Sequence, residues 1–287
     1  MAAALADGGA TVRCLVRDRQ SDRARALASD GHELHEGDVL DAGSLRGAGE
    51  DVDVAYYLVH SMGRGSKDGD FAARERKAAH TFAEMAQREG VGRVVYLGGL
   101  GDEPRSEHLR SRNETAEILR DHGPPLTYFR AAMVVGAQSE SFRTLRYLVE
   151  RLPVMVAPSW LETPTQPIGI DDVVAYLTQA PDVDESRGRE VQIGGPDVVS
   201  YGEMLDVMAT ALGTRRRPKL RVPLLSPGLS SRWIGLVTPV DAGVARPLVE
   251  GLSTPTTVSD DSGMKLFGDI EPLALRDTLE RALAEAR

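Results

Sequence analysis

The chain has 287 residues, of which 41% are apolar and 27% are charged, and its formal net charge is −9 at pH 7. At about 150 residues per domain, this length and composition predict one large folded domain with a modest appendage rather than a disordered or fibrous chain. An acidic protein repels phosphates, and no run approaches the about 20 apolar residues of a membrane helix, so neither nucleic acid binding nor membrane insertion is expected. The single cysteine, Cys14, excludes an internal disulfide and a cysteine zinc site and favours the cytoplasm, and we assign no metal ligands.

In chain order, short β-branched runs alternate with longer amphipathic runs, which is typical of parallel strands joined by helices. The predicted strands are 11–16, 32–37, 52–59, 93–99 and 126–135, and the predicted helices are 21–29, 68–89, 107–122 and 139–151. After about residue 150 the alternation loosens into an apolar run at 152–158, a strand in REVQIGGP, helices capped by Asp171 and Ser200, and a last helix near 273–286. We expect an α/β protein whose parallel sheet spans 1–150 and whose small, mainly helical cap spans 151–287. Both belong to the same globular unit, because the elements of the cap are too small to form a separate core.

Candidate binding residues follow the first two strands, because open parallel sheets bind ligands at the carboxyl ends of their strands. Arg17 occupies the position at which a dinucleotide-binding sheet contacts the adenosine ribose, and an arginine there favours NADP(H) over NAD(H), although Asp18 follows directly. The alternative is a solvated arginine that opens a helix. We expect Asp38 to accept a hydrogen bond from an adenine amino group while Val39 packs on the ring; alternatively, Asp38 caps a helix.

The third strand ends in YYLVHSMG (56–63). Leu58 and Val59 end this buried strand. His60, followed by Ser and Gly, supplies polar groups where a cofactor ribose and pyrophosphate would pass. The alternative is a loop histidine whose hydrogen bonds are satisfied locally.

Nine sequence segments occur in order over about residues 5–215: LVRD, EGDVLD, YYLVHSMG, RVVYLGGLG, HLRSRNETAEILR, RAAMVVGAQSESF, VERLPVMVAP, TQPIGIDDVVAYL and EVQIGGP. In these segments the chain resembles the atypical and extended short-chain dehydrogenase/reductase superfamily. It is most similar to the NmrA-like and complex I 39-kDa-subunit-like branch and to bacterial proteins described as nucleoside-diphosphate-sugar epimerases. The resemblance implies a doubly wound Rossmann fold that binds NAD(P). It also implies a catalytic Ser with Tyr-x-x-x-Lys, in which the tyrosine is the acid/base and the lysine lowers its pKa.

The chain departs from this catalytic set at each position. Gly98 and Gly99 stand at the serine position, and His108 and Arg112 stand at the positions of the tyrosine and lysine. His108 and Arg112 share one helix face, so His108 is a candidate general acid/base and Arg112 a candidate ligand of a ribose hydroxyl or pyrophosphate. The alternative is an ordinary polar face at the start of a helix.

The substrate side is inferred from the same resemblance. Arg130 stands where relatives carry an arginine that lines the route from cofactor to substrate. Gln138, Phe142, Trp160 and Gln166 come from segments that form the pocket wall in such relatives. For Trp160 the alternatives are an aromatic residue at the pocket rim and a packed surface residue.

The start of the chain lacks a feature that the resemblance implies. A dinucleotide fold opens with a strand and a Gly-rich turn at the pyrophosphate, whereas MAAALADGG (1–9) resembles the second half of the first helix. We expect the natural product to begin about 20 residues upstream, and dinucleotide binding to be impaired without that turn. The alternative is a protein that has lost a central strand and is unstable or recruits a strand from another molecule.

We expect a cytoplasmic protein whose partners are a dinucleotide and a small molecule, and a homo-oligomer is possible. Two hypotheses for its function follow. The first is NAD(P)-dependent oxidoreductase or epimerase-type hydride chemistry, in which the cofactor carries the hydride and His108 replaces the tyrosine. The second is a non-catalytic NAD(P)H-sensing or assembly protein. The absence of Ser, Tyr and Lys from the catalytic positions favours this second hypothesis.

Overall fold

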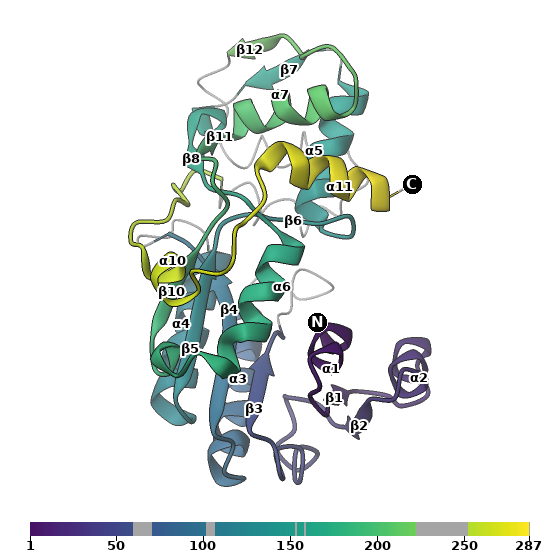
Figure 1. Ribbon diagram of the computed structural model, residues 1–287, viewed down its shortest axis with the longest axis vertical. Helices are drawn as coiled ribbons and strands as arrows, with labels where there is room; N and C mark the ends of the chain where they lie inside the picture. Colours follow the sequence, from purple (N-terminus) through teal and green to yellow (C-terminus); the bar gives the residue numbers. More distant parts are fainter. Residues whose placement is uncertain (60–70, 102–106, 153, 158, 222–251, 287) are drawn as a thin grey trace.

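The computed structural model describes residues 1–59, 71–101, 107–152, 154–157, 159–221 and 252–286 (Figure 1). Within these residues, the main sheet is four-stranded and parallel, in the order β10-β5-β4-β3. Its strands are β3 (Val54–Tyr57), β4 (Arg93–Gly99), β5 (Leu126–Ala131) and β10 (Glu190–Ile193). The predicted strands near 52–59 and at 93–99 are confirmed, whereas the predicted strand 126–135 divides into β5 and the short β6 (Val134–Val135).

Helices cover both faces of the main sheet because its inner strands are apolar on both sides. These helices are α3 (Phe71–Arg88), α4 (Glu107–His122), α6 (Ile170–Gln179) and α10 (Ser262–Leu266). On β4, the side chain of Val94 packs with Phe82 of α3, whereas that of Val95 belongs to a different cluster with Tyr176 of α6. Successive residues of one strand therefore fill two hydrophobic layers, as the α/β prediction requires.

A second parallel sheet lies beside the first. It consists of β1 (Arg13–Val16) and β2 (Glu33–Glu36), with α1 (Ala2–Asp7) before it and α2 (Asp22–Ser29) between its strands. The Arg13 guanidinium pairs with Glu33 and donates a 2.6 Å hydrogen bond to the carbonyl oxygen of Glu50. The carboxylate of Glu89, just after α3, accepts from the backbone N–H of Gly47. The turns that lead into β3 therefore tie the two sheets together.

Of the two predicted helix caps, Ser200 is confirmed and Asp171 is wrong. Ser21, Ser139 and Ser200 each accept a hydrogen bond from a backbone N–H in the first turn of the following helix. Asp171 was predicted to cap the helix over 172–179, but α6 begins at Ile170 with Gly169 as its N-cap. Asp171 instead lies in the first turn, where a carboxylate still interacts favourably with the helix dipole.

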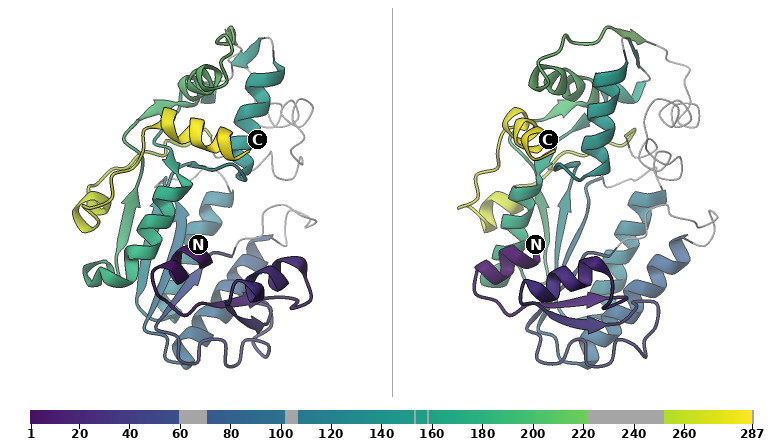
Figure 2. Two further views of the ribbon diagram at one scale, coloured as in Figure 1. Left: turned by 45° about the vertical axis from the view of Figure 1, so that its right-hand side comes forward. Right: turned by 90° about the vertical axis from the view of Figure 1, so that its right-hand side faces the viewer.

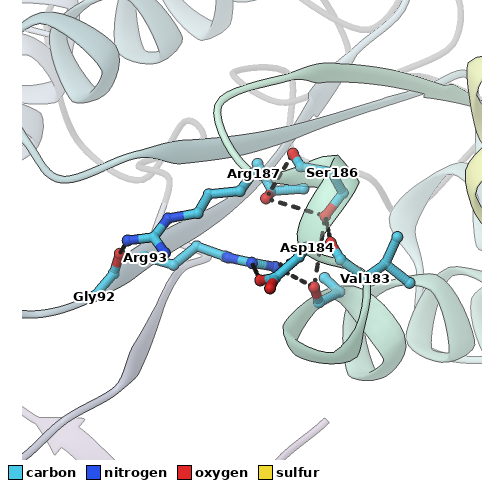
Figure 3. Close-up of polar contacts among 8 residues, drawn as sticks. Gly92, Arg93, Val183, Asp184, Ser186 and Arg187 are labelled. Atoms are coloured by element: carbon cyan, nitrogen blue, oxygen red, sulfur yellow. Dashed lines mark hydrogen bonds and ion pairs between the residues drawn. The ribbon is translucent and has the colours of Figure 1, made fainter.

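The amino end of β4 is fixed by a buried arginine (Figure 3). The side chain of Arg93 is 5% exposed, and its Nη2 lies 2.8 Å from Asp184 Oδ1. Its Nη1 donates to the carbonyl oxygen of Val183 at 3.3 Å, and Arg187 donates to the carbonyl oxygen of Gly92 at 2.8 Å. These contacts hold the end of the sheet that is opposite the carboxyl ends of the strands.

A third hydrophobic cluster lies far from β1 and β2 (Figure 2). Its elements are α5 (Glu140–Arg151), η1 (Ser159–Glu162), α7 (Tyr201–Ala211) and α11 (Leu275–Glu285). Phe142, Met204 and Leu279 have no exposed surface in it. The elements after about residue 150 therefore share this core with α5, which lies almost wholly before residue 150.

Short strand pairs and turns complete the described structure. β6 pairs with β9 (Ile168–Gly169) and β7 (Met155–Ala157) with β12 (Lys219–Arg221), both in parallel, and β8 (Pro164–Thr165) pairs with β11 (Val199–Ser200) in the antiparallel sense. The remaining 3₁₀ turns are η2 (Ala180–Asp182) and η3 (Asp184–Ser186).

Candidate functional site

Arg17 and Asp38 lie at the same end of the two-stranded sheet, because they follow β1 and β2 and these strands are parallel. Arg17 is exposed, and its guanidinium has no hydrogen-bond or ion-pair partner among the residues that the structure describes. It does not open a helix, since α2 begins at Asp22. Asp38 Oδ1 accepts from the backbone N–H of Leu40 at 2.9 Å, so this carboxylate stabilises a turn rather than a helix start. Val39 is half-buried beside it.

The residues after β3 present apolar surface at the corresponding end of the main sheet. The exposed fractions are 38% for Leu58 and 39% for Val59, which is unusual for large apolar residues that continue a strand. The predicted site residue His60 lies outside the described residues.

Gly98 and Gly99 end β4, at the position that the resemblance gives to a catalytic serine. The ring of Tyr128 occupies the space beside Gly98: a Cβ atom there would lie 2.6 Å from Tyr128 Cε2 and 2.6 Å from its hydroxyl oxygen. A Cβ atom on Gly99 would lie 2.7 Å from Cδ2 of Leu109. Both contacts are far shorter than ordinary van der Waals distances. At Gly98 the obstacle is an aromatic ring, whereas at Gly99 it is the end of a flexible leucine side chain.

Tyr128 belongs to a row of tyrosines that no sequence motif indicates. The register places Tyr57, Tyr96 and Tyr128 side by side on β3, β4 and β5. The Tyr96 and Tyr128 rings stack with centroids 5.3 Å apart, and the Tyr57 and Tyr96 centroids are 5.9 Å apart. Burial raises the pKa of all three hydroxyls above the ordinary tyrosine value. The sequence signal was an aromatic residue on each strand, but only the register brings them together.

His108 and Arg112 both belong to α4, one helical turn apart. Arg112 is half-buried, and its Nη1 donates a 2.9 Å hydrogen bond to the carbonyl oxygen of Leu97 on β4. The structure thus holds the Arg112 side chain against the carboxyl-terminal part of β4. The backbone of His108 is described as helical, and its side chain lies outside the described residues.

Arg130 lies at the carboxyl-terminal end of β5 with 8% of its side chain exposed. Its Nε donates to the carbonyl oxygen of Gly99 at 3.1 Å, and its Nη1 contacts Glu190 Oε1 at 2.7 Å. The guanidinium therefore links β4, β5 and β10 beside the two glycines.

The four predicted pocket residues do not come together at one surface. Phe142 is fully buried and Trp160 is 8% exposed, and both belong to the cluster of α5, α7 and α11. Trp160 packs edge to face on Tyr201, with centroids 6.3 Å apart, so it is neither at a rim nor on the surface. Gln166 bridges two backbone segments, since its Nε2 donates to the carbonyl oxygen of Gly195 and its Oε1 accepts from Val258. Gln138 is exposed.

The described part of the chain has neither a metal-binding group of three or more side chains nor a helix that could span a membrane. None of its His, Cys, Asp and Glu side chains form a group of three or more that could hold a metal ion. No described helix is long and apolar enough to cross a membrane.

Comparison with known proteins agrees with this arrangement. The family model described as NmrA-like family matches residues 1–215. The chain belongs to the NmrA-like family. The resemblance to NmrA-like proteins, inferred from the nine sequence segments, is thereby confirmed. One relative of this chain is the mitochondrial NADH dehydrogenase (ubiquinone) 1 alpha subcomplex subunit 9 of Arabidopsis thaliana. It is 24% identical over 223 residues, which are 72% of this chain and 55% of the relative, so the match spans about half of that protein's length.

Solved structures with the same fold include two enzymes with bound cofactors. One is the NADPH-dependent quinone oxidoreductase QOR2 of Escherichia coli in complex with NADPH, at 17% identity and a TM-score of 0.70, with 94% of this chain and 90% of that chain covered. The other is the enzyme WbmH of Bordetella bronchiseptica in complex with NAD⁺, at 16% identity and a TM-score of 0.70, with 99% and 92% covered. At these identities the likeness shows the fold, which is the predicted Rossmann type.

Proposed function

We propose that this NmrA-like protein binds NADP(H) across the carboxyl ends of β1 to β4 and prefers it to NAD(H). The observation that carries the proposal is the exposed Arg17 guanidinium directly after β1, which has no partner among the described residues. A planar guanidinium matches the geometry of a phosphate and binds it through paired hydrogen bonds. The NADPH and NAD⁺ named with the two solved neighbours support the cofactor class, and Arg17 supports the choice within it.

The residues at the strand ends fit the adenosine half of such a cofactor. Arg17 would hold the 2′-phosphate, and the carboxylate of Asp38 would accept a hydrogen bond from the adenine amino group. Leu58 and Val59 expose 38% and 39% of their surface, and their side chains would pack on apolar parts of the ligand. Burial of this apolar surface on binding makes the free energy of association more favourable.

The test of this cofactor choice compares two arginine substitutions by isothermal titration calorimetry. Arg17→Ala removes the 2′-phosphate ligand, and we expect NADPH affinity to fall roughly tenfold to hundredfold, the cost of one charge-assisted hydrogen-bonding group, while NADH affinity changes little. Arg23→Ala is the matched control, because Arg23 is also exposed, on α2, and removes the same charge. Equal effects of the two substitutions, or equal affinity of the unaltered protein for NADPH and NADH, would refute the assignment.

We further propose that hydride chemistry on a small molecule uses His108 and Arg112. A bound nicotinamide dinucleotide would supply or accept the hydride. His108 would exchange the proton with the substrate oxygen, since imidazole titrates near neutral pH. Arg112, which stays charged, would hold a hydroxyl or phosphate oxygen beside the end of β4 and would move no proton.

His108→Ala tests this role, with His122→Ala at the other end of α4 as the control. We expect a panel of ketones, aldehydes and quinones to reveal a slow NADPH-dependent turnover that His108→Ala lowers by at least about 100-fold, the contribution typical of a general acid. NADPH affinity and His122→Ala turnover should stay unchanged. Equal turnover of the two variants would refute the role of His108.

A second candidate function is a non-catalytic sensor of NADP(H). The specific observation in its favour is the Tyr128 ring beside Gly98, which leaves no room for a serine hydroxyl at the position the family chemistry uses. Tight NADPH binding without turnover of any carbonyl in the panel would support this candidate over the first.

A further inference from the structure

Two histidine side chains meet at the surface where α3 packs on α4. The ring centroids of His80 and His122 are 4.5 Å apart, and the ring planes are inclined by 54°. His80 is half-buried on α3, and His122 is exposed at the last residue of α4. Neither imidazole has a hydrogen-bond or ion-pair partner among the residues that the structure describes. The two residues are far apart in the sequence, so no spacing motif indicates this pair.

The backbone beneath the two imidazoles is closely packed. Ala83, on the turn of α3 after His80, is fully buried. A Cβ atom built on Gly123, the residue after His122, would lie 3.5 Å from the Cβ atom of Ala83. The end of α4 therefore contacts α3 directly. Because both side chains project from this fixed frame, little conformational freedom is lost when they bind one ligand together.

The separation of the rings matches two imidazoles that share one metal ion. In such a complex the nitrogen lies about 2.1 Å from the ion, and the ring centroid lies about 1.1 Å further away. Two imidazoles at about 90° around one ion therefore have centroids about 4.5 Å apart, which is the distance in the structure. A half-turn about the Cβ–Cγ bond exchanges the two edges of an imidazole and hardly moves its centroid, so either ring can direct a nitrogen to the shared point.

The charges next to the pair leave it open to a cation. Arg76, one turn before His80, pairs with Glu114 of α4 at 3.3 Å. Lys77 also lies one turn before His80, and the exposed Glu84, one turn after it, offsets that charge. The last carbonyl groups of α4 add negative partial charge, because the carboxyl end of a helix attracts cations.

We propose that His80 and His122 bind one divalent transition-metal ion, such as Ni²⁺ or Cu²⁺, which links α3 to the last turn of α4. Imidazole is a preferred ligand of these ions, and an angle of about 90° between neighbouring ligands suits their octahedral and square-planar geometries. Water would occupy the remaining positions. Because the protein supplies two ligands rather than three or four, we expect exchangeable binding with a dissociation constant of about 10 µM.

The test titrates NiCl₂ into the chelator-treated protein by isothermal titration calorimetry at about pH 8, without dinucleotide, so the result is independent of the proposed NADP(H) site. We expect His80→Ala and His122→Ala each to weaken binding by at least about tenfold, because one imidazole cannot chelate. His35→Gln is the control: it removes a half-buried imidazole of β2, whose Nε2 contacts the carbonyl oxygen of Ser44, and should bind Ni²⁺ like the unaltered protein.

Electron paramagnetic resonance of the protein with one equivalent of Cu²⁺ identifies the ligands. We expect nitrogen splitting from two imidazoles in the unaltered protein and from one imidazole in each alanine variant. Turnover assays of His122→Ala contain a chelator, so that the metal site is empty in both proteins compared there.

The melting temperature gives a separate measure of the link between the helices. At a Ni²⁺ concentration about 100 times the dissociation constant, we expect an increase of about 5 °C for the unaltered protein and the His35→Gln protein, and about none for either alanine variant. Equal binding by the unaltered protein and both alanine variants, a copper spectrum with fewer than two nitrogens, or no binding below about 1 mM would each overturn the proposal.

Discussion

Replacement of Gly98 by Ala should destabilise the protein, whereas the same replacement at the neighbouring Gly99 should not. The Cβ atom of an alanine at position 98 would lie 2.6 Å from Tyr128 Cε2 and 2.6 Å from its hydroxyl. The Tyr128 ring cannot move away easily, because it stacks on Tyr96 at 5.3 Å between centroids and its hydroxyl lies 3.2 Å from Asn113 Oδ1. The strain must therefore be taken up by the strand backbone or by the loss of these contacts.

The magnitude follows from two opposing effects. Overpacking by one carbon atom in a rigid core costs about 1–3 kcal/mol, and replacing Gly by Ala stabilises by about 0.4–1 kcal/mol through the entropy of the unfolded chain. The net loss for Gly98→Ala is about 1–2 kcal/mol, which lowers the melting temperature by about 2–4 °C. At Gly99 the nearest atom is Cδ2 of Leu109, the end of a flexible side chain that can rotate, so the change should stay within about 0.5 kcal/mol.

Urea unfolding followed by circular dichroism measures both values. A double-mutant cycle adds Tyr128→Leu, which removes the ring: Gly98→Ala should cost less in that background, with a coupling free energy of about 1 kcal/mol. Equal stabilities of the Gly98→Ala and Gly99→Ala proteins, or strictly additive effects of Gly98→Ala and Tyr128→Leu, would refute the steric reasoning.

Three further predictions concern buried polar groups. Arg130→Met should lower the free energy of unfolding by about 2–3 kcal/mol through lost charge-assisted hydrogen bonds. Glu190→Gln should cost less than about 1 kcal/mol, because the carboxylate is 37% exposed and screened; equal costs in urea unfolding would contradict this. Arg93→Met should lower the melting temperature more than Asp184→Asn, because Asp184 is 89% exposed whereas Arg93 also donates to the carbonyl oxygens of Ala180 and Val183. The reverse order in calorimetry would be inconsistent with the structure. Burial, assisted by the Asp182 carboxylate, raises the pKa of Tyr56 from its ordinary value near 10 to about 12. The folded pKa is above the unfolded one, so this stability is present below pH 10 and is lost between pH 10 and about 12; Tyr56→Phe should flatten that decline in a pH series of unfolding curves.

The parts of the fold that were predicted correctly depend on local signals. The strand at 93–99 contains the β-branched and aromatic run Val94–Tyr96, and it was predicted with the bounds that the structure has. The predicted cap Ser200 is confirmed because its hydroxyl accepts from an N–H group only three residues away. Arg17 and Asp38 were placed correctly at strand ends because the strands themselves were recognisable.

The sequence by itself determined the α/β class, the positions of most strands and helices, and which residues follow each strand. Only the tertiary structure decided that Phe142 and Trp160 enter a core rather than a pocket wall, because α5, α7 and α11 come from distant parts of the chain. It also decided that the Tyr128 ring fills the space at Gly98. Such features depend on the register between strands and on contacts across many residues, which periodicity and capping signals do not encode.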